Sequence, residues 1–135
     1  MIGLDTNILV RYFAQDDTAQ AQIASRFIES QLDERRPGHV SLVTLAELMW
    51  VMRTRYGTSK DDAVTIAAHL LGDARFVVQA ALAVWAALDA YRQNNVDFSD
   101  ALIAALNRAA GCSHTMTFDR HAARLAGVQL LGAPS

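Results

Sequence analysis

Four acidic residues occupy positions where carboxylates of an α/β protein can do chemistry. Asp5, Glu47 and Asp119 each follow a predicted strand and precede or open a predicted helix. Because all strand-to-helix junctions of a parallel sheet lie at one edge, we expect these three acids there. Asp100 follows a turn between two helices, so spacing alone does not place it at that edge.

Carboxylates that converge repel one another and raise one another's pKa. A hard divalent cation relieves this repulsion, and an all-oxygen ligand set suits Mg²⁺ or Mn²⁺. Mg²⁺ held between carboxylates and phosphates is typical of phosphoryl transfer and of phosphodiester hydrolysis. The acids therefore indicate a metal-dependent enzyme that acts on phosphate esters.

Each acid also has a purely structural interpretation. Asp5 or Thr6 can cap the helix that follows. Thr44-Leu45-Ala46-Glu47 matches a capping box, in which the glutamate reaches back to the cap backbone. Asp100 falls in the first turn of a predicted helix, where the helix dipole favours a carboxylate. A binding module whose acids are only caps therefore remains an alternative.

The elements that must position these residues alternate along the chain. Short apolar or β-branched runs predict strands at residues 2–4, 39–43, 76–78, 112–117 and 128–131. Apolar periodicity, caps and glycines predict helices at residues 8–13, 18–32, 44–56, 59–71, 79–92, 97–110 and 118–126. This alternation predicts an α/β fold in which helices cover both faces of a parallel sheet. The 135 residues contain no evident linker, so we expect one domain.

Composition narrows the class of protein. Hydrophobic residues make up 52% of the chain, which argues against disorder. The formal net charge of −2 shows no global basic field for nucleic acid, although an acidic metal site can offset local arginines. The single cysteine, Cys112, suits a reducing cytoplasm. The longest apolar run, residues 80–88, is too short to span a bilayer, and Asp5 comes too early for a signal peptide, so we expect a cytoplasmic protein without a membrane partner.

Four motifs carry a resemblance to the PIN-domain family, and most closely to the VapC-type toxins of bacterial toxin–antitoxin pairs. In chain order they are Ile2-Gly3-Leu4-Asp5-Thr6-Asn7, Thr44-Leu45-Ala46-Glu47, Asp97-Phe98-Ser99-Asp100-Ala101-Leu102-Ile103-Ala104 and Thr117-Phe118-Asp119-Arg120. The resemblance covers nearly the whole chain. It implies a single PIN-like domain, residues 1–135, whose central parallel sheet of about four or five strands is sandwiched by helices.

By matching position, the resemblance implies a Mg²⁺-dependent endoribonuclease whose catalytic acids are Asp5, Glu47, Asp100 and Asp119. Asp5 and Asp100 would be direct metal ligands, with Asp119 close to the ion. Glu47 would orient water, and Mn²⁺ can replace Mg²⁺. The implied substrate is RNA, and the implied protein partner is a VapB-like antitoxin.

Four further residues have implied supporting roles. Thr6, Asn7 and Thr117 would hold the carboxylates by hydrogen bonds. Asp97 is an additional acid near the quartet. A phosphatase of the aspartyl-phosphate type remains a second alternative because it also places Asp after its first strand. That class usually needs a second Asp two residues later, where this chain has Asn7.

Residues 45–52 and 101–106 are apolar on more faces than one small core can cover, which predicts a homodimer and an apolar groove for the antitoxin. Trp50 is interpreted as a core or interface residue. Arg53 and Arg55 follow this apolar helix and could hold phosphate, but we interpret them as a solvated helix end. Arg120 and Arg124 lie one turn apart beside Asp119, and a contact with RNA is one interpretation of them.

Overall fold

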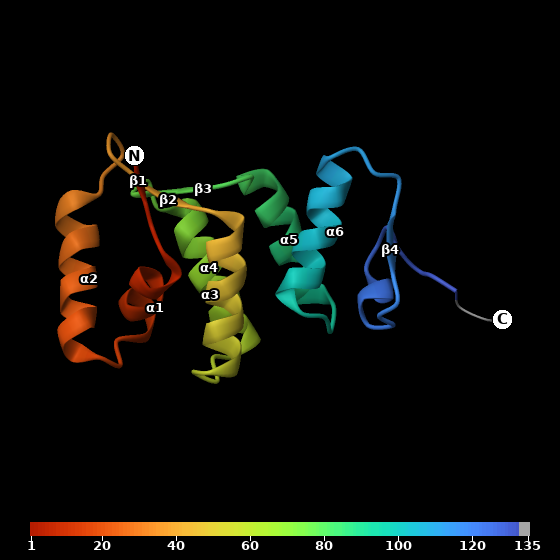
Figure 1. Ribbon diagram of the computed structural model, residues 1–135, viewed down its shortest axis with the longest axis horizontal. Helices are drawn as coiled ribbons and strands as arrows, with labels where there is room; N and C mark the ends of the chain where they lie inside the picture. The colour runs from red at the N-terminus through yellow and green to blue at the C-terminus, as the bar shows by residue number, and fades with distance from the viewer. Residues whose placement is uncertain (133–135) are drawn as a thin grey trace. The chain divides into compact units, whose positions relative to one another are not determined.

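The computed structural model describes residues 1–132, which form two compact units, Met1–Ala81 and a second that begins at Leu82 (Figure 1). The first unit contains β1 (Ile2–Gly3), α1 (Thr6–Ala14), α2 (Thr18–Gln31), β2 (Gly38–Val40), α3 (Leu42–Thr54), α4 (Lys60–Gly72) and β3 (Phe76–Val78). The second contains α5 (Ala81–Gln93), α6 (Phe98–Ala109), β4 (Thr115–Thr117), the 3₁₀ turn η1 (Ala122–Arg124) and β5 (Val128–Leu130).

The first unit is built on a three-stranded parallel sheet in the order β1-β2-β3. In the register of this sheet, Gly38 of β2 lies opposite Ile2 of β1 on one side and Phe76 of β3 on the other. Each crossover passes through two helices, α1 and α2 before β2, and α3 and α4 before β3. The predicted α/β fold with parallel strands is therefore confirmed.

Close packing fixes the middle strand. A Cβ atom added at Gly38 would lie 2.6 Å from Cδ1 of Leu4 and 3.0 Å from Cδ1 of Leu32. Glycine therefore lets β2 approach the side chains that cover it. In the turn before β3, the guanidinium of Arg75 donates to both carboxylate oxygens of Asp73. These hydrogen bonds lower the pKa of the Asp73 carboxyl and stabilise the turn.

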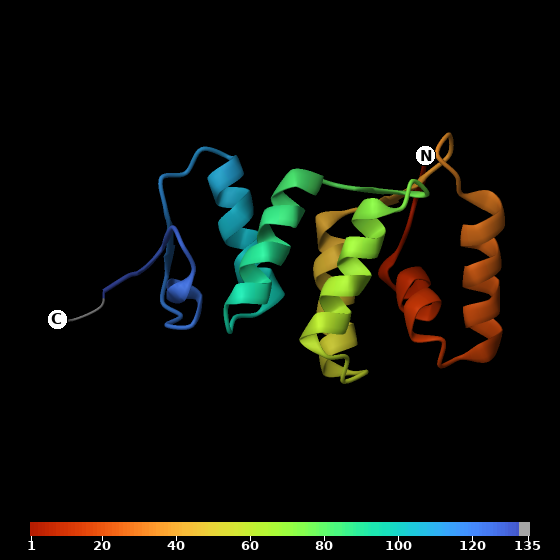
Figure 2. The same cartoon turned by 180° about the vertical axis from the view of Figure 1, so that it is seen from behind.

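The helices of the first unit pack side by side, with α1 between α2 and α3 (Figures 1 and 2). Leu9 of α1, Ile28 of α2, and Leu45 and Leu48 of α3 are fully buried. Burying each such side chain contributes roughly 1.5–3 kcal/mol relative to leaving it exposed. This apolar core therefore fixes α1 against α3, the two helices that carry the acids of this unit.

The second unit has a smaller framework. Its two strands, β4 and β5, are connected by the segment that contains η1. They pair in parallel, with Thr115 opposite Val128. The rings of Tyr91 on α5 and Phe98 on α6 meet edge to face, with their centroids 5.7 Å apart. That contact holds the start of α6, where Asp100 lies.

The structure departs from the predicted elements in three places. The second strand ends at Val40 instead of Val43, because the hydroxyl of Ser41 caps a helix that begins at Leu42 instead of Thr44. The last helix is a single 3₁₀ turn, η1. The strands of residues 1–132 form one sheet of three and one of two, since each pairs only within its own unit.

None of the helices in residues 1–132 combines the length and the apolar character needed to cross a membrane.

Candidate active site

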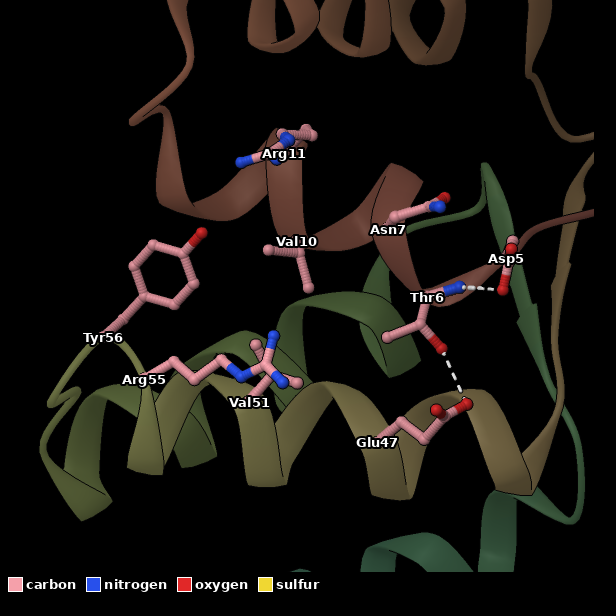
Figure 3. A pocket seen from close by; sticks show the side chains of 9 residues that line it. All are labelled: Asp5, Thr6, Asn7, Val10, Arg11, Glu47, Val51, Arg55 and Tyr56. Carbon is pink, nitrogen blue, oxygen red and sulfur yellow. Dashed lines mark hydrogen bonds between the residues drawn. The ribbon is translucent and has the colours of Figure 1, made fainter.

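Asp5 and Glu47 are brought together by Thr6. The chain leaves β1 through a main-chain hydrogen bond from Leu4 to the carbonyl of His39, and α1 starts at Thr6. Asp5 is the N-cap of α1, and its Oδ1 accepts from the Thr6 N–H at 2.7 Å. The Thr6 hydroxyl donates to Oε1 of Glu47 at 3.0 Å, so one residue contacts both carboxylates (Figure 3).

Glu47 is not a helix cap. The N-cap of α3 is Ser41, whose hydroxyl accepts from the Thr44 N–H at 3.1 Å. The N–H of Leu42 donates to Oε1 of Gln79 at 3.0 Å, so a side chain that follows β3 satisfies a further amide of the first turn. Glu47 therefore lies beyond the first turn, and the capping-box interpretation of residues 44–47 is wrong. The carboxylate of Glu47 is exposed, and it accepts from the Thr6 hydroxyl instead of from the main chain of α3.

Asp5 keeps the structural role that its position suggested. It caps α1, and nothing in that role prevents it from binding a cation, because one carboxylate oxygen is sufficient for the capping bond.

A pocket of about 330 Å³ opens between α1 and α3 in front of these two acids. Figure 3 shows its walls, with Asp5 and Glu47 at one end and Arg11, Arg55 and Tyr56 toward the other. The full lining is Asp5, Thr6, Asn7, Val10, Arg11, Glu47, Val51, Arg55 and Tyr56. The sequence did not reveal the cationic end, because its residues meet only when α1 packs against α3.

The second unit gathers the remaining acids around Asp100. Burial raises the pKa of the Asp100 carboxyl, and the negative charges of Asp119 and Asp97 raise it further. Asp97 is the N-cap residue of α6, but its side chain makes no capping hydrogen bond. The structure thus brings Asp100 close to Asp119, a proximity that the strand-edge argument could not predict.

Local hydrogen bonds fix Asp119 after β4. Its N–H donates to the hydroxyl of Thr117 at 3.0 Å, and its Oδ1 accepts from the N–H of His121 at 2.8 Å. Thr117 therefore orients Asp119 through the backbone and not through the carboxylate. Asn7 lines the first-unit pocket, but its side chain makes no hydrogen bond within residues 1–132.

The donor chemistry of both groups suits a hard cation. The groups consist of carboxylates and hydroxyls, the ligands that Mg²⁺ and Mn²⁺ prefer. Burial contributes most to the raised pKa of Asp100, and a cation would relieve the smaller contribution from the charges of Asp119 and Asp97. Within residues 1–132, no three His, Cys, Asp or Glu side chains are already arranged to hold a metal ion.

A model of the PIN domain family matches residues 2–128, which is nearly the whole chain. The chain belongs to the PIN domain family. Proteins of this family are generally nucleases that use a divalent metal. A search of curated proteins found no match for the chain.

The burial of the Asp100 carboxylate and its proximity to Asp119 and Asp97 predict that the protein becomes more stable when this charge is removed. Asp100→Asn should raise the free energy of unfolding of the metal-free protein at pH 7 by roughly 0.5 kcal/mol. Because the folded-state pKa is raised, this cost of the charge is complete at neutral pH and disappears as the pH falls below about 4. Urea unfolding at pH 7 and pH 3.5 measures both values.

Asp62→Asn is the matched control, because Asp62 is also the third residue of its helix, α4. There the carboxylate interacts favourably with the helix dipole, so its removal should lower stability slightly. An Asp100→Asn protein that is destabilised as Asp62→Asn is would contradict the account of a repulsive cluster.

Proposed function

We propose that the protein is a Mg²⁺-dependent endoribonuclease, one PIN domain over residues 1–135, acting as the toxin of a type II toxin–antitoxin system. The observation that carries the proposal is the exposed carboxylate of Glu47, held beside Asp5 in an open pocket without any capping role. The family match supports it, because one PIN model runs through both units.

The metal would be held by Asp5, Asp100 and Asp119. The hydroxyl and carboxylate oxygens around these residues match the preference of Mg²⁺, and Mn²⁺ can substitute. Asp97 adds a further negative charge near Asp100. When bound, Mg²⁺ supplies positive charge at the attacked phosphate and lowers the pKa of water.

Glu47 is our candidate for general base. The hydroxyl of Thr6 holds Oε1, which fixes the side chain and leaves Oε2 to accept a proton from the attacking water. The N-terminus of α1, at Thr6, adds main-chain N–H groups and a partial positive charge that favour an anionic phosphate nearby. These residues therefore orient the nucleophile and the phosphate before the reaction begins.

RNA as the substrate and a VapB-like antitoxin as the partner are supported by the toxin-like motifs of the sequence. The cytoplasm, where RNA is present and Cys112 stays reduced, is the proposed location. Trp50 and Val43 on α3 are 58% and 71% exposed, which leaves apolar surface for a partner. We assign this surface to a symmetric homodimer. We further propose that the antitoxin lies in a separate apolar groove and presents a basic side chain to the carboxylates.

Cleavage of single-stranded RNA tests the enzymatic proposal. The wild-type protein should cleave with Mg²⁺ and stop when a chelator is added. Asp5→Asn and Glu47→Gln should each fold normally and lose about 100-fold or more of their turnover, because the first change removes a metal ligand and the second a general base. Asp5→Asn should match or exceed wild-type thermal stability, because it removes a repelling charge.

The matched control is Glu29→Gln, which changes an exposed helical glutamate outside the pocket and should leave turnover unchanged. Turnover that survives Glu47→Gln would make Glu47 a structural residue. Wild-type cleavage that persists in the chelator would rule out the metal mechanism. Manganese-dependent hydrolysis of a small phosphomonoester without RNA cleavage would favour the phosphatase alternative.

Light scattering tests the assembly. We expect a dimer at micromolar concentration for the wild-type protein and a shift toward monomer for Trp50→Glu, since that change places a charge in the apolar surface. A monodisperse wild-type monomer would contradict the homodimer. Inhibition that survives removal of every Arg and Lys from the toxin-binding tail of the antitoxin would contradict the proposed inhibitory contact.

A further inference from the structure

The pocket of the first unit has two ends of opposite charge. Glu47 stands at the acidic end and Arg55 at the basic end, with Val51 between them on α3 (Figure 3). These residues are four positions apart, so they form one stripe along the helix. The eight steps from Glu47 to Arg55 correspond to a rise of about 12 Å. The pocket is therefore longer than the contact with a single phosphate requires.

Arg11, the second cation of the pocket, is already engaged. Its Nη1 donates to Oδ1 of Asp16 at 3.1 Å, and its Nε donates to Oε1 of Gln20 at 2.7 Å. The hydroxyl of Tyr56 donates to Oδ2 of Asp16 at 2.8 Å and lowers the pKa of that carboxyl. Asp16 thus stays ionised and keeps Arg11 in place, while Tyr56 closes the pocket wall.

Arg55 differs from Arg11 in having no such partner. Its backbone is fixed at the C-cap of α3, where its N–H donates to the carbonyl of Val51 at 2.8 Å. Within residues 1–132 its guanidinium makes no hydrogen bond and no ion pair. An exposed guanidinium fork that lines a pocket is suited to bind a phosphate through two parallel hydrogen bonds. Arg55 is thus an exposed helix end, as predicted, whose side chain also lines the pocket.

We propose that Arg55 binds a backbone phosphate of a single RNA strand that runs along this pocket, at a position other than the cleaved bond. The inference rests on the proposed function for the identity of the strand. It makes the substrate an oligonucleotide that extends from Asp5 and Glu47 toward Tyr56. Arg55 is then a substrate-positioning residue, whose contact sets affinity and not the rate of the chemical step.

Separate measurements of RNA binding and RNA cleavage distinguish a failure of this proposal from a failure of the proposed function. Fluorescence anisotropy with a labelled single-stranded RNA of 12 nucleotides is measured in chelator, where no metal-dependent cleavage occurs. Arg55→Gln should weaken binding about tenfold and reduce the slope of log affinity against log salt by roughly 0.7, the value for one phosphate contact on a single strand. Arg55→Lys should recover part of the affinity, since it keeps the charge and loses the fork.

Arg26→Gln is the control, because Arg26 is exposed on α2 and does not line the pocket. It should leave both values unchanged. In the cleavage assay with Mg²⁺, Arg55→Gln should raise KM with little change in kcat, as expected for a contact made equally in the ground and transition states. The effect should vanish on a dinucleotide, which is too short to reach Arg55.

Two results would overturn the proposal. The first is an RNA affinity and salt slope that are equal in wild type and Arg55→Gln, which would point to a carboxylate of a protein partner as the ligand of Arg55. The second is a loss of kcat without a change in KM. If the wild-type protein fails to cleave RNA while the binding difference persists, the proposed function is wrong and the phosphate contact stands.

Discussion

β2 has a hydrogen-bonded neighbour on each side, and both neighbours run parallel to it. Because of this pairing, the chain leaves β1 at Asp5 and leaves β2 at Ser41 along the same edge of the sheet. The helices that start there, α1 and α3, then pack against each other through Leu9, Leu45 and Leu48. The hydrogen bond from Thr6 to Glu47, between residues 41 positions apart in the chain, depends on both constraints. Without the parallel pairing, the pocket between the two helices would not form.

The arrangement of charge follows a consistent physical logic. Cationic side chains in the pocket lie away from Asp5 and Glu47, and within the described chain no arginine forms an ion pair with either acid. In the second unit, burial raises the pKa of Asp100, and the negative charges of Asp119 and Asp97 raise it further. A nearby Lys or Arg would reduce the repulsion between such acids and stabilise the fold. Carboxylates that lack a basic partner and lie near one another are groups that a divalent cation can stabilise.

The sequence predicted the parts of the fold that depend on local patterns. The short strand at residues 76–78 and the position of Asp5 after the first strand both follow from composition and spacing, and both are confirmed. The predicted start of α3, at Thr44, was wrong because both Ser41 and Thr44 are acceptable N-cap residues. The choice between them depends on Gln79, which contacts Leu42 from 37 positions away.

The site was predictable only in part, for the same reason. Thr6 was expected to hold a carboxylate, but its bond to Glu47 joins two helices and has no signature in either segment. The cationic end of the pocket was missed because its residues come from distant parts of the chain. Tyr56, for example, donates to Asp16, which lies 40 positions away in the sequence. Asp100 follows a helix–helix turn, so its position near Asp119 could not be predicted from the edge of a parallel sheet.

Our proposal that Asp5, Asp100 and Asp119 hold the same Mg²⁺ ion is central to the proposed function. Titration of the metal-free protein with Mn²⁺, followed by electron paramagnetic resonance, measures this directly, with Asp5→Asn and Asp100→Asn as the variants and Asp62→Asn as the control. We predict one tight class of bound Mn²⁺ per chain in the wild-type protein and in the control, and loss of that class in either variant. Two independent weak sites, one removed by each variant while the other persists, would contradict a shared metal site.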